Sequence, residues 1–153
     1  MNVDVAVNGT GGIIGVGVKI LDSEGQVLAS NAQNIRAGYI TQVAEAMALL
    51  HGLRFACDVG LWPCEVESDA QVLVNFVNGK DISCSDVGLI IHDIKVLLKS
   101  FPTFYVSFVP IYVNAAAHCL AKFSINIQSD CFWLEVFPPS LAQIVMGECP
   151  LKL

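Results

Sequence analysis

The sequence predicts a single α/β domain built on a mixed five-stranded sheet, with elements in the order βββαβααβα. Two observations support this prediction. The first part of the chain has the pattern of three strands joined by tight turns, which indicates an antiparallel meander. The remainder alternates between helical and strand patterns, and such alternation is typical of a sheet with helices against its faces. A chain of 153 residues suits one domain with a sizeable core, and we expect no second domain.

Tight turns delimit the three opening strands, which we predict over residues 2–8, 13–21 and 26–32. The segment 8–12 is rich in glycine and the segment 22–25 ends in glycine, so both linkers have turn chemistry. Short turns of this kind join antiparallel neighbours. The glycine cluster lacks the Gly-Lys-Ser/Thr ending of a phosphate-binding loop and joins two strands, so we interpret it as a hairpin loop.

The first helix is predicted over residues 41–57, where apolar side chains recur at spacings of three and four. Its other face is mostly Ala and Leu, so we expect a central helix that is covered on both sides. A short strand follows at residues 64–67. The spacing of Ser68 and Gln71 then matches a capping box and predicts a helix over residues 69–78.

The last third of the chain completes the pattern. We predict a helix over residues 87–99, a strand over 103–109 and a helix capped by Asn114. Residues 128–153 are harder to assign. We interpret them as a C-terminal extension docked on a domain formed by residues 1–127.

Charge and composition limit the possible partners. The net charge is −6, and only 14% of the residues are charged, against roughly a quarter in an average soluble protein. A negative balance has the wrong sign for binding nucleic acid through phosphate contacts alone. Any polynucleotide binding must therefore be local, assisted by a metal, or supplied by a partner protein.

The sequence also bears on location. Charged residues interrupt the apolar runs well before the roughly 18 residues that a membrane-spanning helix needs, and no signal-peptide pattern opens the chain. The six cysteines contain no C-x-x-C pair and no zinc-type spacing with histidine, which favours reduced thiols. We expect an intracellular protein, nuclear or cytoplasmic, that does not enter a membrane and is a monomer.

Three acidic residues occupy positions where charge is unusual. Asp4 interrupts an apolar strand and Glu45 an apolar helix, and a buried charge is costly unless something pairs with it. A shared divalent cation would pair with both. Other readings stay open: Asp4 facing solvent, Glu45 stabilised by the dipole of a helix N-terminus, and Asp69 as a helix cap. His118 could be an ordinary, partly exposed helix histidine.

Four short motifs occur in an order that resembles plant ribonuclease H-like domains, the kind associated with non-LTR retrotransposon reverse transcriptases. They are Asn2-Val3-Asp4, Ala44-Glu45-Ala46, Val66-Glu67-Ser68-Asp69 and residues 114–122. The resemblance spans roughly residues 1–127, and the tail also carries the tryptophan and prolines with which such domains often end. It implies a ribonuclease H-like fold.

The resemblance also implies a function. Ribonucleases H are metal-dependent endonucleases that hydrolyse the RNA strand of RNA–DNA hybrids, using two Mg²⁺ or Mn²⁺ ions held across the scissile phosphate. When the catalytic positions of the family are transferred to this sequence, the resemblance implies that Asp4, Glu45 and Asp69 are the metal ligands and that all three act in catalysis with His118 as the fourth catalytic residue. Thr41 and Gln42 fall where the family contacts the minor groove of the hybrid, where 2′-hydroxyl groups mark the RNA strand. Thr41 could equally be a plain N-terminal cap.

Some positions differ from the family pattern. His118 replaces an acid, and Mg²⁺ prefers oxygen ligands, so a second ion should be held weakly; histidine could instead transfer a proton. Val5 stands where relatives usually have glycine, and residues 111–113 replace charged residues with Ile-Tyr-Val. The alternative to an active nuclease is therefore a catalytically inactive ribonuclease H-like module that binds a larger protein partner.

Overall fold

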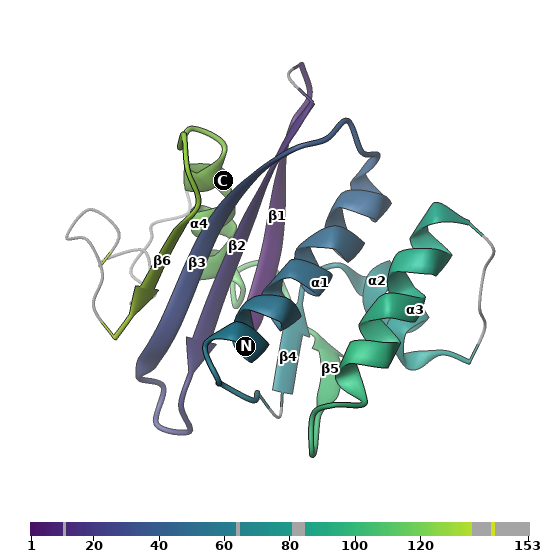
Figure 1. Cartoon of the computed structure of the whole chain (residues 1–153), viewed down its shortest axis with the longest axis vertical. Coiled ribbons are helices and arrows are strands. Elements are labelled where there is room, and N and C mark those ends of the chain that lie inside the picture. Colours follow the sequence, from purple (N-terminus) through teal and green to yellow (C-terminus); the bar gives the residue numbers. More distant parts are fainter. Residues whose placement is uncertain (11, 64, 81–84, 136–141, 143–153) are drawn as a thin grey trace.

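The computed structural model describes residues 1–10, 12–63, 65–80, 85–135 and 142. These residues form a mixed six-stranded sheet in the order β5-β4-β1-β2-β3-β6, with α1 and α4 on opposite faces (Figure 1). The elements are β1 (Asn2–Asn8), β2 (Ile13–Leu21), β3 (Val27–Arg36), α1 (Thr41–Asp58), β4 (Glu65–Ser68), α2 (Gln71–Asn78), α3 (Asp86–Leu98), β5 (Tyr105–Phe108), α4 (Ala115–Ser124) and β6 (Cys131–Leu134). Within the described part of the chain, no helix combines the length and apolar character needed to span a bilayer.

The first three strands form the predicted antiparallel meander. β1 pairs with β2 along its whole length, ending with Asn8 opposite Ile13, so the glycine-rich segment between them is a hairpin loop as predicted. β2 pairs with β3 in the same way, with a bulge after Ile20. β4 and β5 are added in parallel on the other side of β1, which makes the sheet mixed. The predicted fold class is therefore confirmed.

The sheet has one strand more than the sequence predicts. β6 pairs antiparallel with the outer edge of β3, and the Trp133 ring packs against Phe123 of α4 with ring centroids 6.4 Å apart. The strand lies within the predicted extension 128–153, and its four residues are too few for an alternating pattern to be distinguished from a loop. Residues 136–141 and 143–153 of that extension lie outside the described residues. The domain boundary at residue 127 stays a prediction.

Two predicted helix caps do not form. α2 begins at Gln71 rather than at residue 69, because the Ser68 hydroxyl accepts a hydrogen bond from Ala70 N at 3.2 Å and forms no capping box. Asn114 occupies the N-cap position of α4, but its side chain makes no capping hydrogen bond. Its amide is used elsewhere, as described below.

Helix α1 lies between the sheet and α3, as its apolar circumference predicts. Leu49 and Leu53 are fully buried, and Ile94 of α3 belongs to the same core cluster as Val16 and Val18 of β2. Burying apolar surface on both sides of α1 supplies the main driving force for folding. The helix that carries Glu45 is thereby held firmly against the strand that carries Asp4.

On the other face of the sheet, the backbone of α4 lies directly against β2. A Cβ atom added to Gly17 would collide with the Ala117 carbonyl oxygen, and one added to Gly15 would collide with the Ala121 carbonyl oxygen. Only glycine permits so close an approach. Because Gly17 is the register partner of Asp4, this contact sets the distance between α4 and Asp4.

Candidate functional site

The candidate site begins where β1 and β4 cease to pair. In their parallel pairing Asn2 lies opposite Glu67, and Glu67 N donates a hydrogen bond to Met1 O at 2.8 Å. In a regular parallel ladder the next bond would join Asp69 N to the Val3 carbonyl oxygen. That oxygen instead accepts a hydrogen bond from the Asn114 side chain at 2.9 Å. The ladder therefore stops, and a notch opens beside Asp4.

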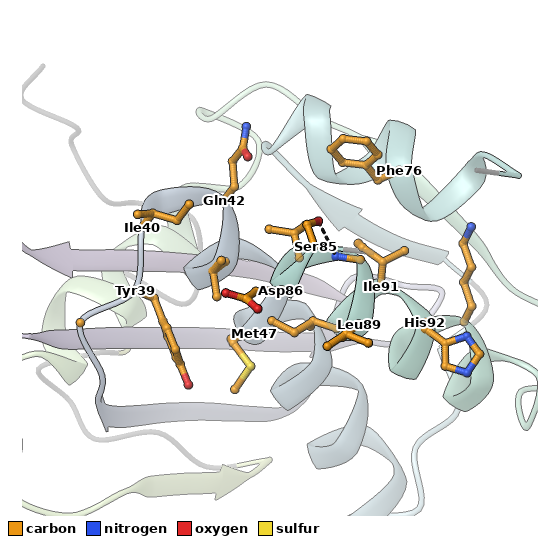
Figure 2. A pocket seen from close by; sticks show the side chains of 16 residues that line it. Tyr39, Ile40, Gln42, Met47, Phe76, Ser85, Asp86, Leu89, Ile91 and His92 are labelled. Carbon is orange, nitrogen blue, oxygen red and sulfur yellow. Dashed lines mark hydrogen bonds between the residues drawn. The ribbon is translucent and has the colours of Figure 1, made fainter. Parts of the chain in front are cut away.

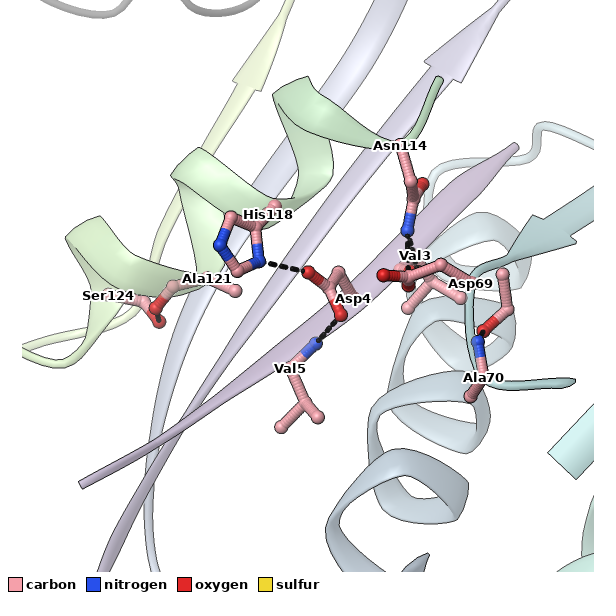
Figure 3. Close-up of polar contacts among 10 residues, drawn as sticks. Val3, Asp4, Val5, Asp69, Ala70, Asn114, His118, Ala121 and Ser124 are labelled. Atoms are coloured by element: carbon pink, nitrogen blue, oxygen red, sulfur yellow. Dashed lines mark hydrogen bonds and ion pairs between the residues drawn. The ribbon is translucent and has the colours of Figure 1, made fainter. Parts of the chain in front are cut away.

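Asn114 joins the three chain segments around this notch (Figure 3). The same amide nitrogen donates to Asp69 Oδ1 at 3.0 Å, so one side chain connects α4 to β1 and to the residue that follows β4. Asn114 is only 1% exposed, and its Oδ1 is buried without a hydrogen-bond partner. Sequence reasoning interpreted Asn114 as a cap, because an asparagine before a helix is the usual signal for one.

His118 lies one helical turn after Asn114 and faces the same strand. Its Nδ1 lies 2.6 Å from Asp4 Oδ2, and the other Asp4 oxygen accepts a hydrogen bond from Val5 N at 2.7 Å (Figure 3). The side chains of His118 and Asp4 are 18% and 11% exposed. His118 is thus paired with Asp4 rather than standing as an isolated surface histidine.

The carboxylates interact strongly enough to change their acidity. The pKa of Asp4 is raised from its ordinary 3.8 to about 6, first by burial and then by the negative charge of Asp69, while the contacts with Val5 and His118 act in the opposite direction. The pKa of Glu45 is also raised, by burial and then by the charges of Asp4 and Asp69. Three carboxylates from separate parts of the chain therefore converge closely enough to repel one another.

Glu45 faces the notch from the side of α1. Together with Asp4 and Val5 it lines a narrow cleft of about 10 Å³, roughly the space of one water molecule. Glu45 lies beyond the first turn of α1, which contains no acidic residue, so the helix dipole does not account for it. Nor does Asp4 face solvent at a sheet edge, since β1 is a central strand.

Comparison with known proteins assigns the chain to a family. A family model described as reverse transcriptase-like matches residues 2–124. The chain belongs to the reverse transcriptase-like family. Among curated protein sequences, none matches the chain.

Solved structures show that this reverse transcriptase-like domain has a ribonuclease H-like fold. RNase H1 from the archaeon Halobacterium salinarum NRC-1 matches with a TM-score of 0.74 at 25% identity, over 81% of this chain and 94% of that one. The N-terminal RNase H domain of a Mycobacterium tuberculosis protein matches at 0.71 and 26%, over 82% and 91%. LC11-RNase H1, solved with an RNA/DNA hybrid, matches at 0.71 and 24%, over 81% and 94%, which supports the fold alone.

The donor atoms of this reverse transcriptase-like domain suit a hard divalent cation. Asp4, Glu45 and Asp69 offer carboxylate oxygens, which Mg²⁺ and Mn²⁺ prefer, and their mutual repulsion would be relieved by a cation. Within the described residues, however, no three acidic, histidine or cysteine side chains stand close enough together to form a ready metal site. The chemistry fits a metal, whereas the ligand positions would have to adjust, beginning with the His118 contact to Asp4.

Thr41 and Gln42 lie at the exposed start of α1, one helical turn before Glu45. Ile40 holds the N-cap position, so Thr41 is not the cap. Gln42 lines a largely apolar pocket of about 750 Å³ between the start of α1 and α3, with Tyr39 and Leu89 among its walls (Figure 2). No sequence pattern indicates this pocket, because its walls come from segments far apart in the chain. A minor-groove role for Thr41 and Gln42 stays a prediction.

Proposed function

We propose that this domain is a metal-dependent endonuclease that hydrolyses the RNA strand of RNA–DNA hybrids. One observation carries the proposal: Asp4, Glu45 and Asp69 converge from β1, α1 and the end of β4, and the charge of Asp69 contributes to the raised pKa of both Asp4 and Glu45. Gathering repelling carboxylates in a half-buried notch costs stability, whereas a site for a polyvalent cation requires such a group. The family and the likeness to ribonuclease H structures support the same reaction.

Each residue has a distinct role in the proposed site. Asp4, Glu45 and Asp69 would hold Mg²⁺ or Mn²⁺, which supplies an activated water and a Lewis acid for the leaving oxygen. Asn114 orients Asp69 through its 3.0 Å hydrogen bond. Val5 N holds one oxygen of Asp4 by a hydrogen bond. The other oxygen, which faces His118, could exchange this contact for a metal ion. His118, with its Nδ1 2.6 Å from Asp4, would be the fourth catalytic residue.

A second candidate function is a catalytically inactive module that binds a larger protein. Two observations favour it: the described residues contain no ready three-ligand site, and His118 already occupies an oxygen of Asp4. The apolar pocket beside α3 would then be a contact surface. A Mn²⁺ titration of thermal unfolding separates the two functions, because a cation that binds only the folded protein raises its melting temperature.

The decisive experiment is cleavage of a labelled RNA–DNA hybrid at high protein concentration, with Mg²⁺ or Mn²⁺. The wild-type chain should cleave the RNA strand, and Asp4→Asn should abolish cleavage because it removes the central carboxylate. Asp93→Asn is the matched control, since Asp93 is an exposed carboxylate on α3. Absence of cleavage by the wild type under both metals would reject the nuclease and leave the inactive module.

A further inference from the structure

The loop between β5 and α4 is fastened to the candidate site at both of its ends. At its start, Val109 N donates to Ser68 O at 3.0 Å, immediately before Asp69. At its end, Asn114 donates directly to Asp69. Residues 110–113 therefore form a short bridge whose two ends meet beside one carboxylate of the proposed site.

The inside of this loop is fixed by its own hydrogen bonds. The Pro110 carbonyl oxygen accepts from Val113 N at 2.9 Å and from Asn114 N at 3.3 Å, which makes a tight turn. Residues 110–113 of this turn are all exposed. Tyr112 is 70% exposed, and Ile111 and Val113 on either side of it are exposed as well.

The chemistry of the loop excludes phosphate binding by charge. No lysine or arginine occurs from Ser100 to Ala121, and the adjoining site contributes only negative charge from Asp4, Glu45 and Asp69. An exposed tyrosine ring offers a different contact, because an aromatic face stacks on the neutral face of any nucleobase. The ring of Tyr112 can make such a contact without opposing the charge of the site.

We propose that Tyr112 stacks on an unpaired nucleobase next to the cleaved phosphodiester, so that the preferred substrate is an RNA–DNA hybrid with a single-stranded flank. The inference rests on the proposed nuclease function and names its substrate class. Bases inside a hybrid are already stacked on their neighbours, whereas an unpaired base beside the cleavage site can present its face to a protein ring. A blunt hybrid would lack this contact.

The test compares two labelled substrates in metal-free buffer at low salt, so that binding is measured by fluorescence anisotropy without cleavage. One is a blunt RNA–DNA hybrid and the other is the same hybrid with a single-stranded flank. Wild-type protein should bind the flanked hybrid more tightly. Tyr112→Ala should weaken binding of the flanked hybrid roughly 5- to 100-fold, to the level of the blunt one, as expected for the loss of one base–aromatic stack.

Two further variants make the test specific. Tyr112→Phe keeps the ring and should bind like the wild type. Phe132→Ala removes a ring of similar exposure, 65%, from β6 at the opposite edge of the sheet from β5, and should change neither affinity. Unchanged thermal melting of each variant shows that the domain is folded.

Several outcomes would overturn the inference. Equal affinity of the wild type for the two hybrids would do so. An equal loss of affinity for both after Tyr112→Ala would also do so, because it would make Tyr112 a contact to the shared duplex rather than to an unpaired base. A different result would reject the proposed nuclease function alone. Should Tyr112 govern binding of the flanked hybrid while no hybrid is ever cleaved with Mn²⁺, the stacking role stands and the enzymatic role falls.

Discussion

The Asn114 side-chain amide donates to the Val3 carbonyl oxygen at 2.9 Å, at the position where the ladder between β1 and β4 would otherwise continue. A buried side chain thus replaces a backbone rung and leaves Asp69 free to turn toward Asp4. The notch forms because the Asn114 side chain takes the place of a backbone donor at the Val3 carbonyl oxygen.

Replacing Asn114 tests that dependence. Asn114→Ala should lower the free energy of unfolding by roughly 1–3 kcal/mol, because the Val3 carbonyl oxygen and the Asp69 carboxylate lose their donor in a buried place. Urea denaturation gives the value. Asn34→Ala is the matched control, since the Asn34 amide also donates to two acceptors, Ser124 O and Ile125 O, away from the carboxylates. Both variants should lose stability, but only Asn114→Ala should also lose hybrid cleavage.

The raised pKa of Asp4 predicts how metal-free stability depends on pH. Because the carboxyl binds its proton more tightly in the folded state, stability is highest below pH 4 as far as this group is concerned. It falls as the pH rises from about 3.8 to about 6, by up to roughly 3 kcal/mol, and stays low above that range. Asp4→Asn should remove this part of the pH dependence in urea denaturation with EDTA. The prediction is wrong if the two pH profiles run parallel between pH 4 and 6.

Gly17 should be irreplaceable, since it permits α4 to lie against β2. Gly17→Ala places a methyl group against the Ala117 carbonyl oxygen and should cost about 1–3 kcal/mol or more of stability. Gly9→Ala is the control, because nothing lies within 4 Å of a Cβ at Gly9, and its effect should stay within about 0.5 kcal/mol. Thermal or urea unfolding measures both. Equal effects of the two substitutions would contradict the close packing.

His118→Asp should have opposite effects on stability and activity. A carboxylate facing Asp4 adds repulsion, so the melting temperature in EDTA should fall, while a further oxygen ligand should strengthen metal binding and increase the rate of hybrid cleavage. His118→Asn removes the imidazole without adding charge and serves as the control. An unchanged cleavage rate in His118→Asp would count against placing residue 118 among the metal ligands.

The sequence predicts most of the fold because its signals are local. The turn residues near Gly9 and Gly25 and the apolar spacing in α1 each determine structure within a few neighbours. The sequence analysis missed β6 because four residues carry too little pattern, and the residues of β3 with which it pairs lie about a hundred positions away. Asn114 was misinterpreted for a related reason. A cap and a bridge between segments have the same sequence signature, and only the tertiary structure decides which acceptors the amide reaches.

The site was only partly predictable. The charges of Asp4 and Glu45 in apolar surroundings drew attention to them, since burial makes charge expensive. Their convergence with Asp69 needed the sheet to bring β1 beside the end of β4. The contact of His118 with Asp4 depended on the glycines of β2, whose effect on the position of α4 no local pattern could indicate.

The pairing of β6 with β3 has a consequence for where the domain can be divided. A chain cut at residue 127 would keep Asp4, Glu45 and Asp69 but would leave the outer edge of β3, from Ala29 to Ala32, without a neighbouring strand. An uncovered edge of this kind invites the same segment of another molecule to add itself to the sheet. β6 therefore covers an edge that would otherwise favour aggregation. A chain shortened to residue 127 should self-associate in solution.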